Sequence, residues 1–162
     1  MAVLSHALPP RPYTSPMRWL AIDHGTKRIG LAFSDELEIL ASPFEVWPSD
    51  GQALDRLARL CREEGVQALV VGLPRHKDGA ESATAPAARA FAEGLAARTG
   101  LPHLLWDEHL SSAEAERLLA QRGVKPERRK ALLDAAAAAV ILADLLETRR
   151  GKGIPPGAFG PV

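Results

Sequence analysis

Three short apolar runs follow one another closely near the start of the chain, at residues 19–22, 29–33 and 39–47. Only a few residues join each run to the next, whereas a parallel return to the same sheet needs a crossover of about a dozen residues or more. The spacing therefore predicts three neighbouring antiparallel strands. Pro43 interrupts the third run and has no N–H group to donate to a ladder, which predicts a strand at the sheet edge.

The rest of the chain alternates helical and strand patterns. Helices are predicted at residues 50–64, 82–98, 111–121 and 126–149. Residues 68–74 are apolar throughout, as in a buried parallel strand, and residues 101–106 form another short strand. This order predicts an α/β fold with a mixed five-stranded sheet, three antiparallel strands followed by two parallel ones, and helices on both faces. We expect the first strand at the centre, with the fourth parallel beside it.

The two ends of the chain differ in composition from the part between them. Residues 1–16 hold four prolines and lack the continuous apolar core of a signal peptide, so we expect a flexible N-terminal extension. Residues 151–162 are dominated by glycine and proline, which predicts a flexible tail. One folded domain is therefore expected at residues 17–150.

Charge and cysteine content narrow the classes of function. The formal net charge is +0, with 20 basic and 20 acidic residues. This balance argues against a broad, non-specific nucleic-acid binder but leaves room for a local basic patch. The single cysteine, Cys61, excludes an intramolecular disulfide and fits a reducing compartment. No cluster of cysteine and histidine has zinc spacing, and no segment resembles a membrane span.

Acidic residues stand at the ends of two predicted strands. Asp23 ends the first apolar run, and the pair Asp107 and Glu108 follows the last strand. Ligands of α/β sheets collect at the carboxyl ends of strands, so we expect these acids to meet there. Asp134 precedes an alanine-rich run in the final helix, whose small side chains would let the helix approach the sheet closely. Such a carboxylate cluster suits Mg²⁺ or Mn²⁺, which prefer oxygen ligands.

Alternatives remain for each part of this site. Asp107 competes with Glu108 as a ligand, because one residue along a strand reverses the face. Asp134 has a simpler interpretation as an acid near the start of a helix, where the helix dipole favours it. Basic residues near the same sheet end could bind a phosphate backbone, although those before Asp134 could instead be a solvated helix start. The nucleic-acid-binding candidates are Lys27, Arg28, Arg75, Lys77, Arg128 and Arg129.

Several blocks in this order resemble the YqgF family, also called RuvX. They are Asp23-x-Gly25-Thr26-Lys27-Arg28-Ile29-Gly30, Val70-Val71-Gly72-Leu73-Pro74 with Asp78-Gly79, Trp106-Asp107-Glu108, the Glu114-Ala115-Glu116 helix, and Asp134 before its alanines. The resemblance covers about residues 18–147. One departure is visible: His109 stands where the family usually has an arginine, which weakens the carry-over of an arginine–phosphate contact.

The resemblance implies a ribonuclease H-like fold and a cytoplasmic, Mg²⁺- or Mn²⁺-dependent endonuclease, a hydrolase. It implies catalytic and metal-binding roles for Asp23, Glu108 and Asp134. Two activities are attached to the family: 5′-end processing of pre-16S rRNA in ribosome biogenesis, and resolution of Holliday junctions in DNA recombination. We predict the first, with the second as an alternative. The partners would be structured RNA or branched DNA, together with ribosome precursors and no membrane, and the protein would be a monomer or a homodimer.

Two hypotheses from other classes stay open. A non-catalytic nucleic-acid or ribosome-assembly protein on the same fold would bind without cleaving in any divalent metal. An ATP-binding phosphotransferase is a further alternative by analogy of fold. The chain is short for the two-lobed cleft of those enzymes, and its sequence contains no second phosphate loop.

Overall fold

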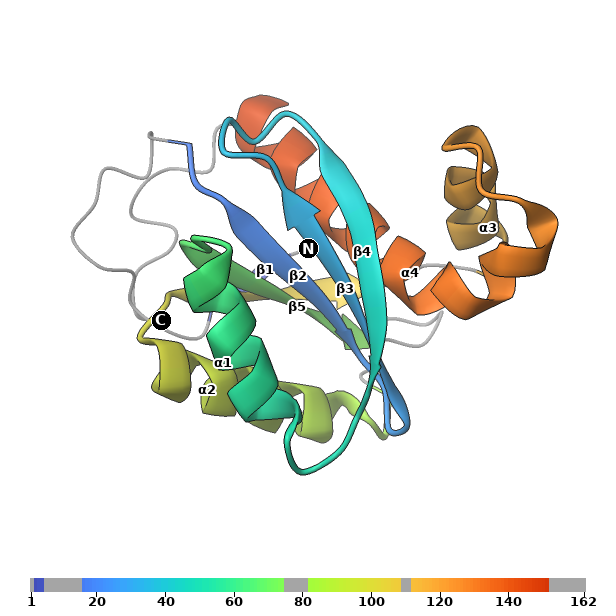
Figure 1. Ribbon diagram of the computed structural model, residues 1–162. Helices are drawn as coiled ribbons and strands as arrows, with labels where there is room; N and C mark the ends of the chain where they lie inside the picture. Colours follow the sequence, from blue (N-terminus) through green and yellow to red (C-terminus); the bar gives the residue numbers. More distant parts are fainter. Residues whose placement is uncertain (1, 5–15, 75–81, 109–111, 152–162) are drawn as a thin grey trace.

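The computed structural model describes residues 2–4, 16–74, 82–108 and 112–151 (Figure 1). Within them the strands form one six-stranded sheet in the order β1-β6-β5-β2-β3-β4. The strands are β1 (Ala2–Leu4), β2 (Trp19–His24), β3 (Arg28–Ser34), β4 (Ala41–Pro48), β5 (Ala68–Pro74) and β6 (His103–Glu108). The helices are α1 (Ala53–Glu63), α2 (Ala85–Thr99), α3 (Ser112–Gln121) and α4 (Pro126–Gly151).

The sheet has the predicted mixture of directions. β2 pairs antiparallel with β3 and parallel with β5, β3 pairs antiparallel with β4, and β5 pairs parallel with β6. These are the five predicted strands, with the first of them at the centre. β4 carries Pro43 and lies at an edge of the sheet, as the missing N–H group of proline predicted.

A sixth strand adds to the predicted five. β1 runs antiparallel along β6, with Val3 opposite Leu105, inside the segment expected to be a flexible extension. An edge strand leaves N–H and C=O groups unpaired, and this short apolar segment satisfies some of those on β6. Three residues are too few to show a strand period, so the pattern could not predict it. The expectations for residues 5–15 and 152–162 lie outside the described residues.

Helices cover both faces of the sheet. α1 and α2 pack on one face, while α4 crosses the other and α3 packs against α4 (Figure 1). Side chains of β2 alternate between the two cores. Leu20 and Ile22 join the core beneath α1 and α2, whereas Trp19 and Ala21 join the core beneath α4. The next residue in the second series is Asp23, so the alternation directs its side chain to the α4 face.

The helix α4 approaches the sheet closely at Gly30 of β3. A Cβ atom added at Gly30 would collide with the backbone carbonyl of Asp134 in α4. The alanine run after Asp134, residues 135–139, is buried as predicted and leaves room for this approach. Because Gly30 is the residue of β3 that faces Asp23 in the ladder, the contact brings Asp134 to the end of β2 that carries Asp23.

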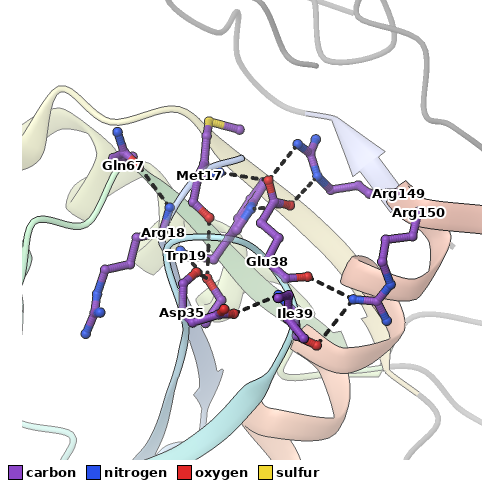
Figure 2. Close-up of polar contacts among 10 residues, drawn as sticks. Met17, Arg18, Trp19, Asp35, Glu38, Ile39, Gln67, Arg149 and Arg150 are labelled. Atoms are coloured by element: carbon purple, nitrogen blue, oxygen red, sulfur yellow. Dashed lines mark hydrogen bonds and ion pairs between the residues drawn. The ribbon is translucent and has the colours of Figure 1, made fainter. Parts of the chain in front are cut away.

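The other end of α4 is fixed by a buried acid in the turn between β3 and β4 (Figure 2). The Glu38 carboxylate accepts hydrogen bonds from the backbone N–H of Met17 at 2.7 Å and from Trp19 Nε1 at 3.2 Å. It also pairs with Arg149, whose Nε lies 2.6 Å from Glu38 Oε1. Arg150 donates to the Glu38 carbonyl at 2.8 Å. These contacts join the β3–β4 turn, the start of β2 and the C-terminal end of α4.

Candidate active site

A cavity of about 710 Å³ opens beside α4 at the carboxyl end of β2. Its polar lining comes from residues in β2, β3, β6 and α4, namely Asp23, Arg28, Glu108, Glu127, Lys130 and Asp134. The three predicted acids, which lie up to 111 positions apart along the chain, therefore border one cavity. Asp107 does not border it.

Strand alternation explains why Glu108 rather than Asp107 reaches this cavity. Leu104 and Trp106 of β6 pack in the core beneath α4, whereas Leu105 packs beneath α1 and α2. Continuing the period of two directs Glu108 to the α4 face and Asp107 to the opposite one. Of the two acids that the sequence left open, Glu108 is therefore the one whose side chain lies on the same face as Asp23.

Gly72 of β5 makes room for Glu108 to approach Asp23. β5 lies between β2 and β6 in the sheet. A Cβ atom added at Gly72 would lie 2.6 Å from Ile141 Cδ1 and 3.0 Å from Glu108 Oε2. The Glu108 carboxyl group therefore passes over Gly72 in space that a larger residue would fill, and it forms a hydrogen bond with Asp23.

The two hydrogen-bonded acids favour their protonated forms. Burial is the largest cause that raises the pKa of Asp23 to about 6; the hydrogen bond with Glu108 opposes the rise and the charge on Asp134 adds to it. Burial likewise raises the pKa of Glu108 to about 8, assisted by the charge on Asp23, their hydrogen bond and the charge on Asp134. Two carboxyl groups this close share a proton because both cannot carry a negative charge cheaply.

Asp134 borders the same cavity but pairs with a cation. Its Oδ2 atom accepts a hydrogen bond from Arg28 Nε at 2.8 Å. The side chains are 65% exposed for Arg28 and 32% exposed for Asp134, so water screens the pair. In the geometry described, no three acidic, histidine or cysteine side chains within the described ranges converge closely enough to hold a metal ion.

Only some of the predicted nucleic-acid-binding residues that the structure describes lie at the cavity. Arg28 lines the cavity, and Lys27 lies exposed in the turn before it. Arg128 is exposed outside the cavity lining, and Arg129 donates to the carbonyl of Val124 at 2.9 Å, which ties it to the loop before α4. Arg75 and Lys77 lie outside the described residues.

Two residues of α4 that the sequence did not single out as site residues line the cavity. Lys130 and Glu127 stand four and seven residues before Asp134, which is one and two helical turns. Residues four apart lie on one face of a helix, so the distance from Asp134 could have predicted that Lys130, and not Arg128 or Arg129, faces the cavity. His24, next to Asp23, lies on the other face, with its ring 4.5 Å from that of Phe91, and burial lowers its pKa.

The fold places the protein in a structural class. A mixed sheet with this strand order and helices on both faces is a ribonuclease H-like fold. Two solved structures share this fold. The RuvC structure from Thermus thermophilus superimposes with a TM-score of 0.54 at 19% identity, over 83% of this chain and 97% of that one. A fowlpox virus resolvase in complex with Holliday junction DNA superimposes with a TM-score of 0.56 at 12% identity, over 82% of this chain and 98% of that one.

Sequence comparison narrows the class to one family. Residues 17–148 match the family described as RuvX, Holliday junction resolvase, and the chain belongs to it. A relative from Symbiobacterium thermophilum is 43% identical over 88% of this chain and 99% of its own length. A relative from Anaeromyxobacter is 44% identical over 82% of this chain and 98% of its own length. Both carry the provisional name of a pre-16S rRNA nuclease. The chain is a member of a nuclease family, whose reaction class is phosphodiester hydrolysis.

One negative finding concerns the helices. None of those in the described part of the chain has both the length and the apolar composition that a membrane span needs.

Proposed function

We propose that this protein is an endonuclease that hydrolyses phosphodiester bonds with the help of Mg²⁺ or Mn²⁺, and that Asp23, Glu108 and Asp134 are its metal-binding and catalytic residues. The observation that carries the proposal is the pair of partly buried carboxyl groups, Asp23 and Glu108, which contact each other in the lining of one cavity and whose pKa values are raised chiefly by burial. Within the described part of the chain neither acid forms an ion pair. Acids that lose water without gaining a cation destabilise a fold, so two of them in the lining of one cavity indicate a site kept for function.

The donor set fits a hard divalent cation. All three groups offer carboxylate oxygens, the ligands that Mg²⁺ and Mn²⁺ prefer. In such a site the chemistry that a divalent cation supplies is activation of a water molecule and neutralisation of charge on the leaving oxygen. Asp23 and Glu108 would give up their shared proton on binding it, and Asp134 would turn from Arg28 toward them. Arg28 and Lys130, at the rim of the same cavity, would orient the phosphate.

The proposed substrate is the 5′ end of pre-16S rRNA, within ribosome precursors in the bacterial cytoplasm. The support is that relatives above 40% identity over most of the chain are named for that RNA. The second candidate is a Holliday junction, supported by the description of the family. A two-fold symmetric junction would favour a homodimer, whereas an RNA end could be processed by a monomer.

A side-by-side cleavage assay tests this proposal. The purified protein is incubated with Mn²⁺ and either a precursor rRNA carrying its 5′ extension or a four-way DNA junction. We expect cleavage of the RNA at its 5′ side, and a loss of at least about 100-fold in the Asp23→Asn variant, since even partners of metal ligands cost up to that much. Asp55→Asn is the matched control, because Asp55 is an exposed acid of α1 that pairs with Arg98.

Other outcomes separate the alternatives. Cleavage of the junction alone would assign the protein to DNA recombination. Binding of either substrate without cleavage in Mg²⁺ or Mn²⁺ would support the non-catalytic hypothesis. Undiminished cleavage by Asp23→Asn would remove the proposed site.

A further inference from the structure

The contact between Arg28 and Asp134 joins two distant parts of the chain at the cavity. Arg28 begins β3 and Asp134 lies in α4, and their side chains meet with 2.8 Å between Nε and Oδ2. Arg28 stands two residues before Gly30, the point at which the backbone of α4 at Asp134 touches β3. Alternation places residues 28 and 30 on one face of the strand, so Arg28 extends along the same face as Asp23 and reaches Asp134 from the side.

This ion pair is not what holds α4 on the sheet. Water reaches both partners, and exposed ion pairs contribute little to stability. The close packing of Gly30 against the helix backbone and the buried alanines already fix α4 there. The pair between Glu38 and Arg149 at the other end of α4 is different, because both of its side chains are only 10% exposed. Because other contacts fix the helix, Arg28 and Asp134 can separate and bind other partners at a small cost in stability.

Asp134 borders the same cavity as one cation and two acids. Arg28 pairs with Asp134, and Asp23 and Glu108, which form a hydrogen bond with each other, line the same cavity. The charge on Asp134 acts on both acids, so the three groups are within electrostatic reach of one another. While Asp134 is paired with Arg28, the described side chains supply no set of three converging donors.

We propose that Arg28 is a positioning residue that competes with a divalent cation for the Asp134 carboxylate. The inference rests on the proposed function and adds a regulation to the same site. A guanidinium group binds phosphate with the same two-pronged geometry that it uses for carboxylate. A phosphate of the nucleic acid would therefore draw Arg28 away from Asp134, and the freed carboxylate would join Asp23 and Glu108. Cation and nucleic acid would then bind more tightly together than apart.

Manganese affinity tests the competition without any measurement of cleavage. Free Mn²⁺ is followed by electron paramagnetic resonance during titration of the full-length protein. Arg28→Gln should bind Mn²⁺ about two- to fivefold more tightly than the wild type, the range that an exposed ion pair is worth. Lys130→Gln is the matched control, because it removes a positive charge from the same cavity while the ion pair with Asp134 belongs to Arg28. Lys130→Gln should raise the affinity for Mn²⁺ less than Arg28→Gln does.

A double-mutant cycle shows whether the effect acts through Asp134. In the Asp134→Asn background, Arg28→Gln should raise Mn²⁺ affinity no more than Lys130→Gln does. In a second titration, a fluorescent RNA hairpin should raise the Mn²⁺ affinity of the wild type more than that of Arg28→Gln.

Four results would overturn the inference. If Arg28→Gln and Lys130→Gln raise the affinity for Mn²⁺ equally, the effect comes from the loss of a positive charge and not from the ion pair with Asp134. A gain that persists in the Asp134→Asn background would show that Arg28 acts elsewhere. If the wild type binds Mn²⁺ and cleaves nucleic acid but Arg28→Gln gains nothing, the inference fails and the proposed function stands. Absence of Mn²⁺ binding in every one of these proteins would remove the proposed function and the inference with it.

Discussion

Acidic side chains that are fully or partly buried lie near both ends of α4, and their surroundings differ. At the C-terminal end, Glu38 is surrounded by donors: a backbone N–H, an indole N–H and the guanidinium of Arg149 (Figure 2). Near the N-terminal end, Asp23 and Glu108 face each other and share a hydrogen bond, and the pKa of each is raised chiefly by burial.

The difference lies in what surrounds each acid: hydrogen-bond donors surround Glu38, whereas Asp23 and Glu108 face each other. A buried carboxylate whose oxygens meet several donors stabilises the fold, because the donors replace the water that it has lost. Two partly buried acids that face each other, with no ion pair to either among the described residues, cost stability. The backbone of Glu38 has a φ of 58°, an unusual value for a residue other than glycine, and the network around its carboxylate compensates for that strain.

The largest expected effect on stability is at the Glu38 end. Glu38→Ala removes the carboxylate that pairs with Arg149, whose side chain is only 10% exposed, and we expect the free energy of unfolding to fall by about 3–5 kcal/mol in urea denaturation. Glu36→Ala, two residues earlier and exposed, is the matched control and should change it by less than about 0.5 kcal/mol. If the two variants behave alike, the Glu38 network is not a structural anchor and the contrast between the two ends of α4 is lost.

At the cavity end, the corresponding anchor is a backbone contact and not an ion pair. Gly30→Ala would place a methyl group against the backbone carbonyl of Asp134, so α4 must move; we expect a loss of about 1–3 kcal/mol by thermal or urea unfolding. Cleavage should fall as well, because Asp134 moves with the helix. Gly51→Ala serves as control, since a Cβ atom there meets nothing within 4 Å. Normal stability in Gly30→Ala would contradict the close approach.

The third expected effect is a dependence of the free energy of unfolding on pH, caused by the two acids Asp23 and Glu108 in the cavity. The raised pKa values mean that the folded protein favours the neutral forms of Asp23 and Glu108. Their contribution to stability is complete below the ordinary values of 3.8 and 4.5, and it is lost as the pH rises through about 6 and about 8. In EDTA, the wild type should lose on the order of 2 kcal/mol over this range relative to the Asp23→Asn, Glu108→Gln double variant.

Unfolding by urea at a series of pH values measures this difference. Parallel curves for the wild type and the double variant would mean that the two acids ionise normally. The distinction between the ends of α4 would then rest on geometry alone.

The smallest expected effect comes from an ion pair at the surface. Arg98 and Asp55 pair at 2.9 Å between α2 and α1, with side chains 43% and 77% exposed. Asp55→Ala should cost about 0.2–1 kcal/mol, and less in high salt, because water and ions screen the pair. A cost as large as that of Glu38→Ala would show that burial is not what gives the Glu38 network its strength.

The sequence anticipated the main lines of the fold because they follow from local rules. Short links between apolar runs require antiparallel strands, a wholly apolar run suits a buried parallel strand, and Pro43 belongs at an edge. β1 was missed, since three residues carry no period and their pairing depends on the unpaired edge of β6. The network of Glu38 and Arg149 was missed as well, because the two residues are 111 positions apart.

The site was anticipated less completely than the fold. Asp23, Glu108 and Asp134 border one cavity, but the cations chosen on α4 were Arg128 and Arg129, whereas Lys130 is the one that lines it. A run of basic residues does not reveal which of them faces inward until a reference point on the helix is fixed. The helical position of Asp134 is that reference, and it has meaning only once the helix is known to lie on β3.

The sequence by itself determined which segments become strands and helices, which strands run antiparallel, and which acids end the strands. Periodicity, link length and the chemistry of proline and alanine act over a few residues and can be recognised along the chain. The tertiary structure alone decided that Glu108 and not Asp107 meets Asp23, that the two share a hydrogen bond with raised pKa values, and that Arg28 pairs with Asp134. These properties depend on distance and burial in space, because charges interact through the medium between them and not along the chain.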